Sequence, residues 1–163
     1  MKILIVYYTW SGNTEKIAKT IHKLVGGDIV KLEPERPYPS SYNATVQQAK
    51  KEIREGYKPA LKTKIENIGE YDVIFVGSPN WWGTIAPPVV SFLTQYDLSG
   101  KTIVPFFSHG GGGKQRMLET LKSLCPKSKV LEEFAVYGVG GADLKQKLSQ
   151  WLSKLGFKGV SSD

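Results

Sequence analysis

The sequence predicts an α/β protein: one domain, residues 1–163, built on a doubly wound, five-stranded parallel sheet with helices on both faces. Two observations predict this class. Short apolar runs alternate with amphipathic stretches along the chain, and most of the segments that join them are short. Such alternation implies a parallel sheet covered by helices. A length of 163 residues suits one domain, and no internal repeat or linker divides the chain.

The expected strands are short runs that are rich in apolar and β-branched residues. The run Val73–Gly77 is apolar throughout, which is typical of a strand buried on both faces of a sheet. The five expected strands are Ile3–Tyr8, Asp28–Leu32, Val73–Gly77, Thr102–Phe107 and Val130–Tyr137.

The expected helices place apolar residues three to four positions apart. The pair Gly26 and Gly27 ends the first helix, and Gly56 ends the second. Pro87 and Pro88 suit the first turn of the third helix, where a missing N–H costs nothing. Residues 57–71 are mixed and polar, and we expect a long connection there. The five helices are expected to begin near Thr14, Tyr42, Pro87, Gln115 and Leu144.

Composition narrows the class of protein further. No apolar run approaches the roughly 20 residues that a membrane-spanning helix needs, and no signal-peptide cleavage site follows the first apolar run. Cys125 is the only cysteine, so no internal disulfide can form, and this fits a cytoplasmic protein. The net charge is +7, but the basic residues are scattered rather than gathered in a nucleic-acid-binding arm. The excess favours acidic partners or anionic ligands.

In an open parallel sheet, ligands bind outside the carboxyl ends of the strands. The loops to examine therefore follow the first, third and fourth expected strands. The first loop joins a strand to a helix and is crowded with hydrogen-bond donors. Its residues are Thr9, Trp10, Ser11, Gly12, Asn13 and Thr14.

This first loop is typical of an anion site. The unpaired N–H groups and positive dipole end of a helix N-terminus attract an anion, and the side chains add further donors. Helix capping alone also favours Ser, Thr and Asn, but it requires only one of them. The loop lacks the GxxxxGK[ST] pattern of a P-loop and the GxGxxG pattern of a dinucleotide site. A terminal monophosphate is the ligand group that we expect here.

The other two loops add an aromatic wall and a glycine-rich segment. Two adjacent tryptophans in a loop suit a flat ring, although one of them can instead pack as core. A glycine-rich loop lets backbone approach a ligand closely, although four glycines also suit a flexible linker. Together the loops indicate a flat cofactor with a monophosphate tail, which FMN fits better than an adenine dinucleotide. The residues concerned are Pro79, Asn80, Trp81, Trp82, Gly83 and Thr84, then Ser108, His109, Gly110, Gly111, Gly112 and Gly113.

These three motifs, in this order, resemble those of the flavodoxin family. The strand–TWSGNT–helix segment is similar to the family's phosphate loop, and YDVIFVGSPNWWGTIAPP and SHGGGG stand where its two flavin loops fall. The resemblance runs nearly end to end. It implies strand order 2-1-3-4-5, non-covalent FMN, and electron transfer without a metal. It also implies a carrier that meets redox partner proteins, as a monomer or weak dimer, with no nucleic acid or membrane involved.

The resemblance assigns a part of FMN to each loop. Residues 9–14 would hold the phosphate, residues 79–84 would border the isoalloxazine ring, and residues 108–112 would close its other side. In flavodoxins a peptide of the first flavin loop reorients on reduction. Trp82–Gly83 is the corresponding candidate, since glycine tolerates both orientations.

The chain departs from the family pattern in two respects. Flavodoxins are strongly acidic, whereas this chain is basic and neither flavin loop contains Asp or Glu. We therefore expect a less reducing flavin. The second flavin loop carries glycines in place of an aromatic lid, which leaves one ring face more open.

Two alternatives to an electron carrier stay open at this point. An open ring face would suit an NAD(P)H-dependent quinone or flavin oxidoreductase, with His109 near the substrate. A flavodoxin-like domain without flavin could instead serve as a scaffold or binding protein. The carrier is favoured because the sequence shows no nicotinamide site and no additional substrate loops.

Overall fold

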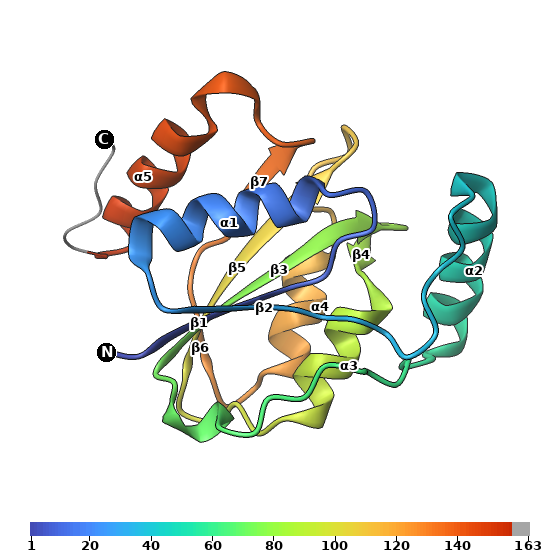
Figure 1. The fold of residues 1–163 in the computed structure, drawn as a ribbon, viewed down its shortest axis with the longest axis horizontal. Helices are drawn as coiled ribbons and strands as arrows, with labels where there is room; N and C mark the ends of the chain where they lie inside the picture. The colour runs from blue at the N-terminus through green and yellow to red at the C-terminus, as the bar shows by residue number, and fades with distance from the viewer. Residues whose placement is uncertain (158–163) are drawn as a thin grey trace.

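The computed structural model describes residues 1–157, and Figure 1 shows its central sheet between two helical layers. The helices α1 and α5 cover one face of the sheet, and α3 and α4 cover the other. The strands are β1 (Ile3–Tyr7), β2 (Asp28–Lys31), β3 (Val73–Trp81), β4 (Thr84–Ile85), β5 (Thr102–His109), β6 (Lys129–Val130) and β7 (Phe134–Tyr137). The helices are α1 (Asn13–Val25), α2 (Tyr42–Glu55), α3 (Pro87–Gln95), α4 (Met117–Leu124) and α5 (Leu144–Lys154). Short 3₁₀ helices cover Ile68–Glu70 and Gly141–Asp143.

The strand order is β2-β1-β3-β5-β6, and β7 also pairs with β5. All these pairs are parallel, whereas β4 forms an antiparallel hairpin with β3. Counting the parallel strands along the chain, with β6 and β7 as two parts of the fifth, gives the order 2-1-3-4-5. The predicted fold class and strand order are thus confirmed.

Side chains of the central strands alternate between two apolar clusters. In β1, Leu4 and Val6 belong to the cluster under α3 and α4, while Ile3 and Ile5 belong to the cluster under α1 and α5. The strand period of two produces this division, because successive side chains point to opposite faces. Burial on both faces explains why the central strands are apolar throughout.

Helix α2 is the exception, since it covers neither face of the sheet. Figure 1 shows it to one side, beside the edge where the strands end. Neither apolar cluster includes a residue of α2, and its buried residues are Thr45, Ala49 and Glu52. Buried carboxylates need hydrogen-bond partners, and Glu52 accepts bonds from the Tyr38 hydroxyl and from Gln48 Nε2.

Three predicted boundaries were wrong. The fifth expected strand is broken into β6 and β7, and the Glu132 carbonyl between them accepts a bond of 3.0 Å from Trp151 Nε1. The expected helix at Gln115 begins at Met117, because Gln115 has a left-handed φ of 43° that cannot continue a helix. Strand β3 extends beyond Gly77 to Trp81, where the hairpin with β4 prolongs the pairing.

Two further features bear on the expectations from composition. No helix within residues 1–157 is long and apolar enough to cross a membrane. Cys125 is buried, and burial raises the pKa of its thiol to about 11.

Gly77 is required by a close approach between two central strands. It lies opposite Phe106 in the β3–β5 register, and an added Cβ would overlap the Phe106 ring. Phe106 is fully buried. We expect Gly77→Ala to lower the free energy of unfolding by about 2 kcal/mol, measured by urea denaturation.

Gly69→Ala is the matched control, since nothing lies within 4 Å of its added methyl group. Equal midpoints for the two variants would contradict this account of the β3–β5 contact.

Candidate functional site

A cleft of about 890 Å³ opens at the carboxyl ends of the parallel strands. Small-molecule sites commonly measure roughly 300 to 1,000 Å³, so the cleft has room for a cofactor. The loops after β1, β3 and β5 form three of its sides, and α2 forms the fourth. It is lined by Trp10, Ser11, Asn13, Tyr42, Thr45, Val46, Ala49, Pro79, Asn80, Trp81, Trp82, Gly83, Ser108, His109, Gly110, Gly112 and Gln115.

The first loop presents the start of α1 to this cleft. Gly12 adopts a left-handed φ of 100°, and its N–H donates to Thr9 Oγ1 at 2.9 Å. This bond turns the chain into the helix and uses one donor of the loop. The first N–H groups of a helix have no partner within it, so those that follow Gly12 stay available to an anion. Ser11 and Asn13 line the cleft beside them.

Thr14 joins the first loop to the third instead of lining the cleft. Its side chain is 1% exposed, and its hydroxyl shares a 2.8 Å hydrogen bond with the Ser108 hydroxyl. These residues are 94 positions apart in the chain. The bond fixes the start of α1 relative to the end of β5, and thereby one corner of the cleft.

The second loop is a tight β-hairpin turn with Trp82 and Gly83 at its tip. Their φ angles are 56° and 84°, and they separate the paired residues Trp81 and Thr84. Two positive φ angles in a two-residue hairpin define a type I′ turn. The position of Trp82 is unusual, since left-handed backbone is strained for any residue with a large side chain.

The two tryptophans have different surroundings. Trp81 packs edge-on against the rings of Tyr38 and Tyr8, at centroid distances of 5.0 and 5.5 Å. Trp82 is 46% exposed. Its Nε1 donates to the Val46 carbonyl of α2 at 3.0 Å, and Lys50 Nζ lies 5.1 Å from the centroid of its ring. Both side chains line the cleft, so the wall is aromatic from its buried end to its rim.

Asn80 ties the second loop to the third. Its Oδ1 accepts a 2.8 Å bond from the Gly83 N–H, and its Nδ2 donates at 2.8 Å to both the Gly113 carbonyl and Gln115 Oε1. The Arg116 N–H adds a 2.8 Å bond to the Gly83 carbonyl. These four bonds hold the hairpin turn against the glycine-rich segment.

The third loop has one buried residue followed by an exposed glycine segment. Ser108 is buried, whereas Gly110, Gly111 and Gly112 are exposed. His109 Nδ1 accepts a 3.1 Å bond from the Gly111 N–H, so the neutral ring carries its proton on Nε2. The His109 ring also meets that of Tyr137 edge-on, at a centroid distance of 6.2 Å.

The electrostatic character of the cleft is neutral to positive. None of its lining residues is acidic. Glu52 is a buried residue of α2, and its carboxylate accepts a hydrogen bond from the Tyr38 hydroxyl. Burial, and after it this bond, raises the pKa of the Tyr38 phenol above its ordinary value, so Tyr38 stays a donor. No group of three or more His, Cys, Asp or Glu residues suited to a metal ion occurs in residues 1–157.

The structure brings most of the predicted site residues together. Those that line the cleft are Trp10, Ser11, Asn13, Pro79, Asn80, Trp81, Trp82, Gly83, Ser108, His109, Gly110 and Gly112. Those that do not are Thr9, Gly12, Thr14, Thr84 and Gly111. Thr9 and Thr14 act within the loops as described above, and Thr84 Oγ1 donates to Thr120 Oγ1 at 2.8 Å, away from the cleft.

Sequence reasoning missed the contribution of α2 and of Gln115. Tyr42, Thr45, Val46 and Ala49 line the cleft from α2. The spacing of apolar residues predicts a helix here, but it cannot place that helix at the sheet edge. The proline-rich segment before α2 was the available signal that this part of the chain has a fixed conformation. In the structure the Pro39 carbonyl accepts bonds from Trp10 Nε1 and Thr45 Oγ1, and these bonds connect the segment to the first loop and to α2.

Fold and site together define a flavodoxin-like α/β protein whose cleft suits a flat, phosphorylated ligand. The donors gather at the start of α1, the aromatic wall stands beside them, and no acidic residue opposes an anion. The chain belongs to the flavodoxin family: the family model described as Flavodoxin matches residues 2–155.

Solved structures agree with this assignment. A candidate flavoprotein from Bacteroides eggerthii is 32% identical, with a TM-score of 0.85 over 96% of this chain and 99% of its own. A flavoprotein from Lactobacillus acidophilus, solved in complex with FMN, is 24% identical, with a TM-score of 0.71 over 92% and 97%. Oxidised Flavodoxin 1 from Bacillus cereus is 17% identical, with a TM-score of 0.61 over 99% and 100%, and shares the fold.

The hydrogen bonds of Asn80 give a test of the site that needs no ligand. Asn80→Ala leaves the Gly83 N–H without its acceptor and frees the turn from the glycine-rich segment. Since one such bond contributes about 1 kcal/mol, we expect the Gly83 amide to exchange with solvent several-fold faster, as measured by NMR.

Gln115→Asn is the matched control for this experiment. Its shorter side chain withdraws one acceptor from Asn80, keeps the Gly83 bond, and tolerates the left-handed backbone at this position. Unchanged Gly83 exchange in Asn80→Ala would show that the turn does not depend on this side chain.

Proposed function

We propose that this protein binds FMN non-covalently and acts as an electron carrier that exchanges electrons with partner proteins. One observation carries the proposal: a single cleft combines the donor-rich start of α1 with a wall of two tryptophans. None of the residues that line this cleft is acidic. Family membership supports it, as does the FMN complex of the Lactobacillus acidophilus flavoprotein.

The residues of the cleft fit the parts of FMN. Ser11 and Asn13, with the N–H groups at the start of α1, would hold the phosphate. Trp81, Trp82 and the glycine-rich segment would border the ring system. When bound, FMN supplies a centre that can accept one or two electrons.

The hairpin turn offers the ring two different backbone groups. The Gly83 N–H is already held by Asn80 Oδ1 at 2.8 Å. The Trp82 carbonyl oxygen has no hydrogen-bond partner among residues 1–157, so it can accept a hydrogen bond from a donor on the ring system. A reorientation of the Trp82–Gly83 peptide would break the hydrogen bond from the Gly83 N–H to Asn80 Oδ1. The strength of this bond therefore contributes to the free energy that the reorientation requires.

The acid-free cleft bears on the reduction potential. Carboxylates near a flavin disfavour added negative charge, and at contact distance such interactions are worth about a few kcal/mol. The cleft has no lining carboxylate, and Lys50 stands at its rim beside Trp82. We infer a less negative potential than in the acidic members of the family.

A second candidate function is an NAD(P)H-dependent quinone or flavin oxidoreductase. The exposed glycines favour it, because Gly110 and Gly112 line the cleft without an aromatic lid. His109 Nε2 could then meet a substrate, since only Nδ1 is bonded to the loop.

The phosphate site can be tested by a change of charge at Ser11. This residue is exposed and lines the cleft, so Ser11→Asp should fold normally. A carboxylate beside the phosphate should weaken FMN binding roughly a hundredfold, through repulsion of about 3 kcal/mol. Quenching of flavin fluorescence during titration of the apoprotein measures the affinity.

Riboflavin, which lacks the phosphate, is the internal control. Its affinity should be nearly the same for Ser11→Asp and for the unchanged protein. An equal loss for both flavins would mean that residues 9–14 do not hold the phosphate.

The electron-carrier role can be tested by anaerobic reduction of the FMN-loaded protein. Dithionite should reduce it, and NADH or NADPH should not, because a carrier depends on a partner enzyme. Absorbance follows the titration, and reference dyes in the same cell report the potential.

Rapid bleaching by NAD(P)H would favour the oxidoreductase instead. A potential as low as that of an acidic flavodoxin would refute the argument from the acid-free cleft. Failure of the apoprotein to take up FMN would remove both candidate functions.

A further inference from the structure

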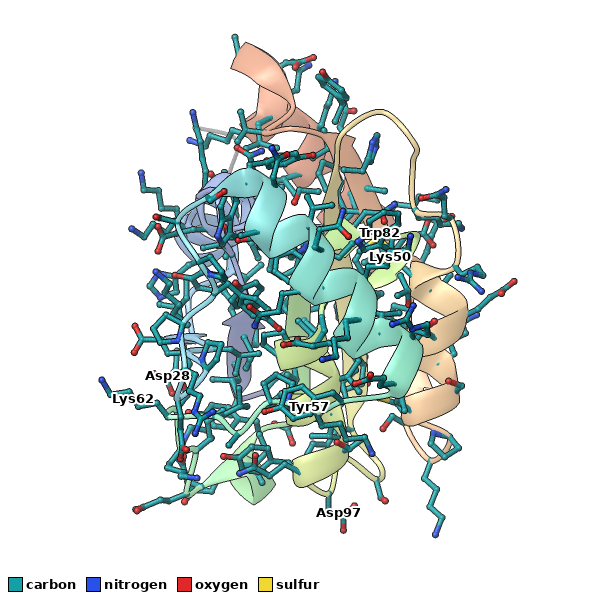
Figure 2. All side chains as sticks on the ribbon, turned by 90° about the vertical axis from the view of Figure 1, so that its right-hand side faces the viewer. Asp28, Lys50, Tyr57, Lys62, Trp82 and Asp97 are labelled. Carbon is teal, nitrogen blue, oxygen red and sulfur yellow. The ribbon has the colours of Figure 1, made fainter. Side chains whose placement is uncertain are left out.

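The side of the molecule that carries α2 gathers positive charge. Figure 2 views this side, with α2 across the front, Lys50 beside Trp82, and Tyr57 further along. Lys50, Lys51 and Arg54 are exposed on α2, and Lys58 follows its end. We call this surface, together with Arg116, the α2 face.

Few carboxylates neutralise the α2 face. Within residues 1–157, none of its five cations lies within 4.0 Å of a carboxylate oxygen. Of the two glutamates near the end of α2, Glu52 is buried and bonded to Tyr38, and only Glu55 is exposed. One of the two acids is thus turned inward, and only Glu55 is left to offset the charge at the surface.

The α2 face also contains a groove. It has a volume of about 300 Å³ and lies between the end of α2, the start of α3 and the start of α4. Lys58, which follows α2, and Arg116, which precedes α4, both line it. Tyr57, which is 52% exposed, and the buried Glu52 line it as well. A guanidinium and an ammonium in one groove suit carboxylate side chains, which arginine can bind in a bidentate manner.

Trp82 connects the α2 face with the cleft. Its side chain lines the cleft, while its Nε1 bonds to Val46 of α2 and its ring lies under Lys50. A protein seated on the α2 face would therefore lie next to the rim of the cofactor cleft. Exposed aromatic residues with arginine are also typical of the central part of protein interfaces.

We propose that the α2 face is the docking surface for an acidic redox partner protein, whose carboxylates pair with Lys51, Arg54, Lys58 and Arg116. The argument is charge complementarity. Within residues 1–157, the face offers five cations without a carboxylate oxygen inside 4.0 Å, and two of them, Lys58 and Arg116, line its groove. The inference rests on the proposed function, since it names the class of partner that meets the same cleft. Docking of this kind speeds association and weakens with salt.

The test is charge reversal in the FMN-loaded protein. The variant K51E/R54E/K58E reverses three of the five cations of the α2 face and changes no residue that lines the cleft. The matched control K23E/K127E/K129E changes the net charge equally, at exposed positions away from α2. Circular dichroism and urea denaturation check that both variants are folded.

The probe is a strongly acidic plant-type ferredoxin, and basic cytochrome c serves as the opposite probe. Association is measured by titration calorimetry at low and at physiological ionic strength, and NMR maps the contact. We expect salt-sensitive binding of ferredoxin to the unchanged protein and to the control. In the α2-face variant, affinity should fall roughly tenfold or more. NMR changes should centre on α2 and Arg116.

Three results would overturn the proposal: no salt-sensitive binding of the ferredoxin, an equal loss in both variants, or cytochrome c binding as strongly to the same face. Flavin fluorescence, recorded on the same samples, distinguishes a failure of the docking proposal from a failure of the proposed function. Normal FMN binding without ferredoxin association refutes the docking surface alone. Ferredoxin association without FMN binding refutes the carrier role and leaves the surface standing.

Discussion

The parallel pairing of β1, β3 and β5 is the constraint on which the rest of the structure depends. Tyr7 pairs with Gly77, and Gly77 pairs with Phe106, so the three strands are level near their carboxyl ends. The three loops therefore begin at nearly the same height, although they are far apart in the chain. Gly77 makes the register possible, because any side chain there would enter the Phe106 ring. Thr14 and Ser108 then complete the arrangement with one buried hydrogen bond across the edge.

Helix α2 turns this open edge into a cleft with four sides. An amphipathic helix normally buries an apolar stripe against a sheet, but α2 buries Thr45, Ala49 and Glu52. Its position is fixed by polar contacts at particular points: Glu52 with Tyr38, Thr45 with the Pro39 carbonyl, and Val46 with Trp82. Such contacts stabilise less than apolar burial does. We infer that α2 is the element of the site whose attachment is easiest to weaken.

What the sequence could and could not predict follows from the range of the interactions involved. The strands, the edge at which the loops meet and the donor cluster were predictable, because each depends on a local pattern or on a general rule of parallel sheets. The role of Asn80 was not, since its partners Gly113 and Gln115 lie more than 30 positions away. Thr84 shows the same limit. It sits in the predicted loop, yet the hairpin twist turns its hydroxyl to Thr120.

Trp82 contacts both the cleft and α2, and the strain in its backbone indicates that its side chain has a role there. A left-handed conformation in a residue other than glycine costs on the order of 1 to 3 kcal/mol, and it persists only when surrounding contacts fix it. Here Val46, Lys50 and the Asn80–Gly83 bond do so. Glycine at this position would relieve the strain, but it would remove the ring that joins the cleft to α2. The retained strain thus favours a function for the Trp82 ring at the rim, where a bound cofactor and a docked protein would come closest.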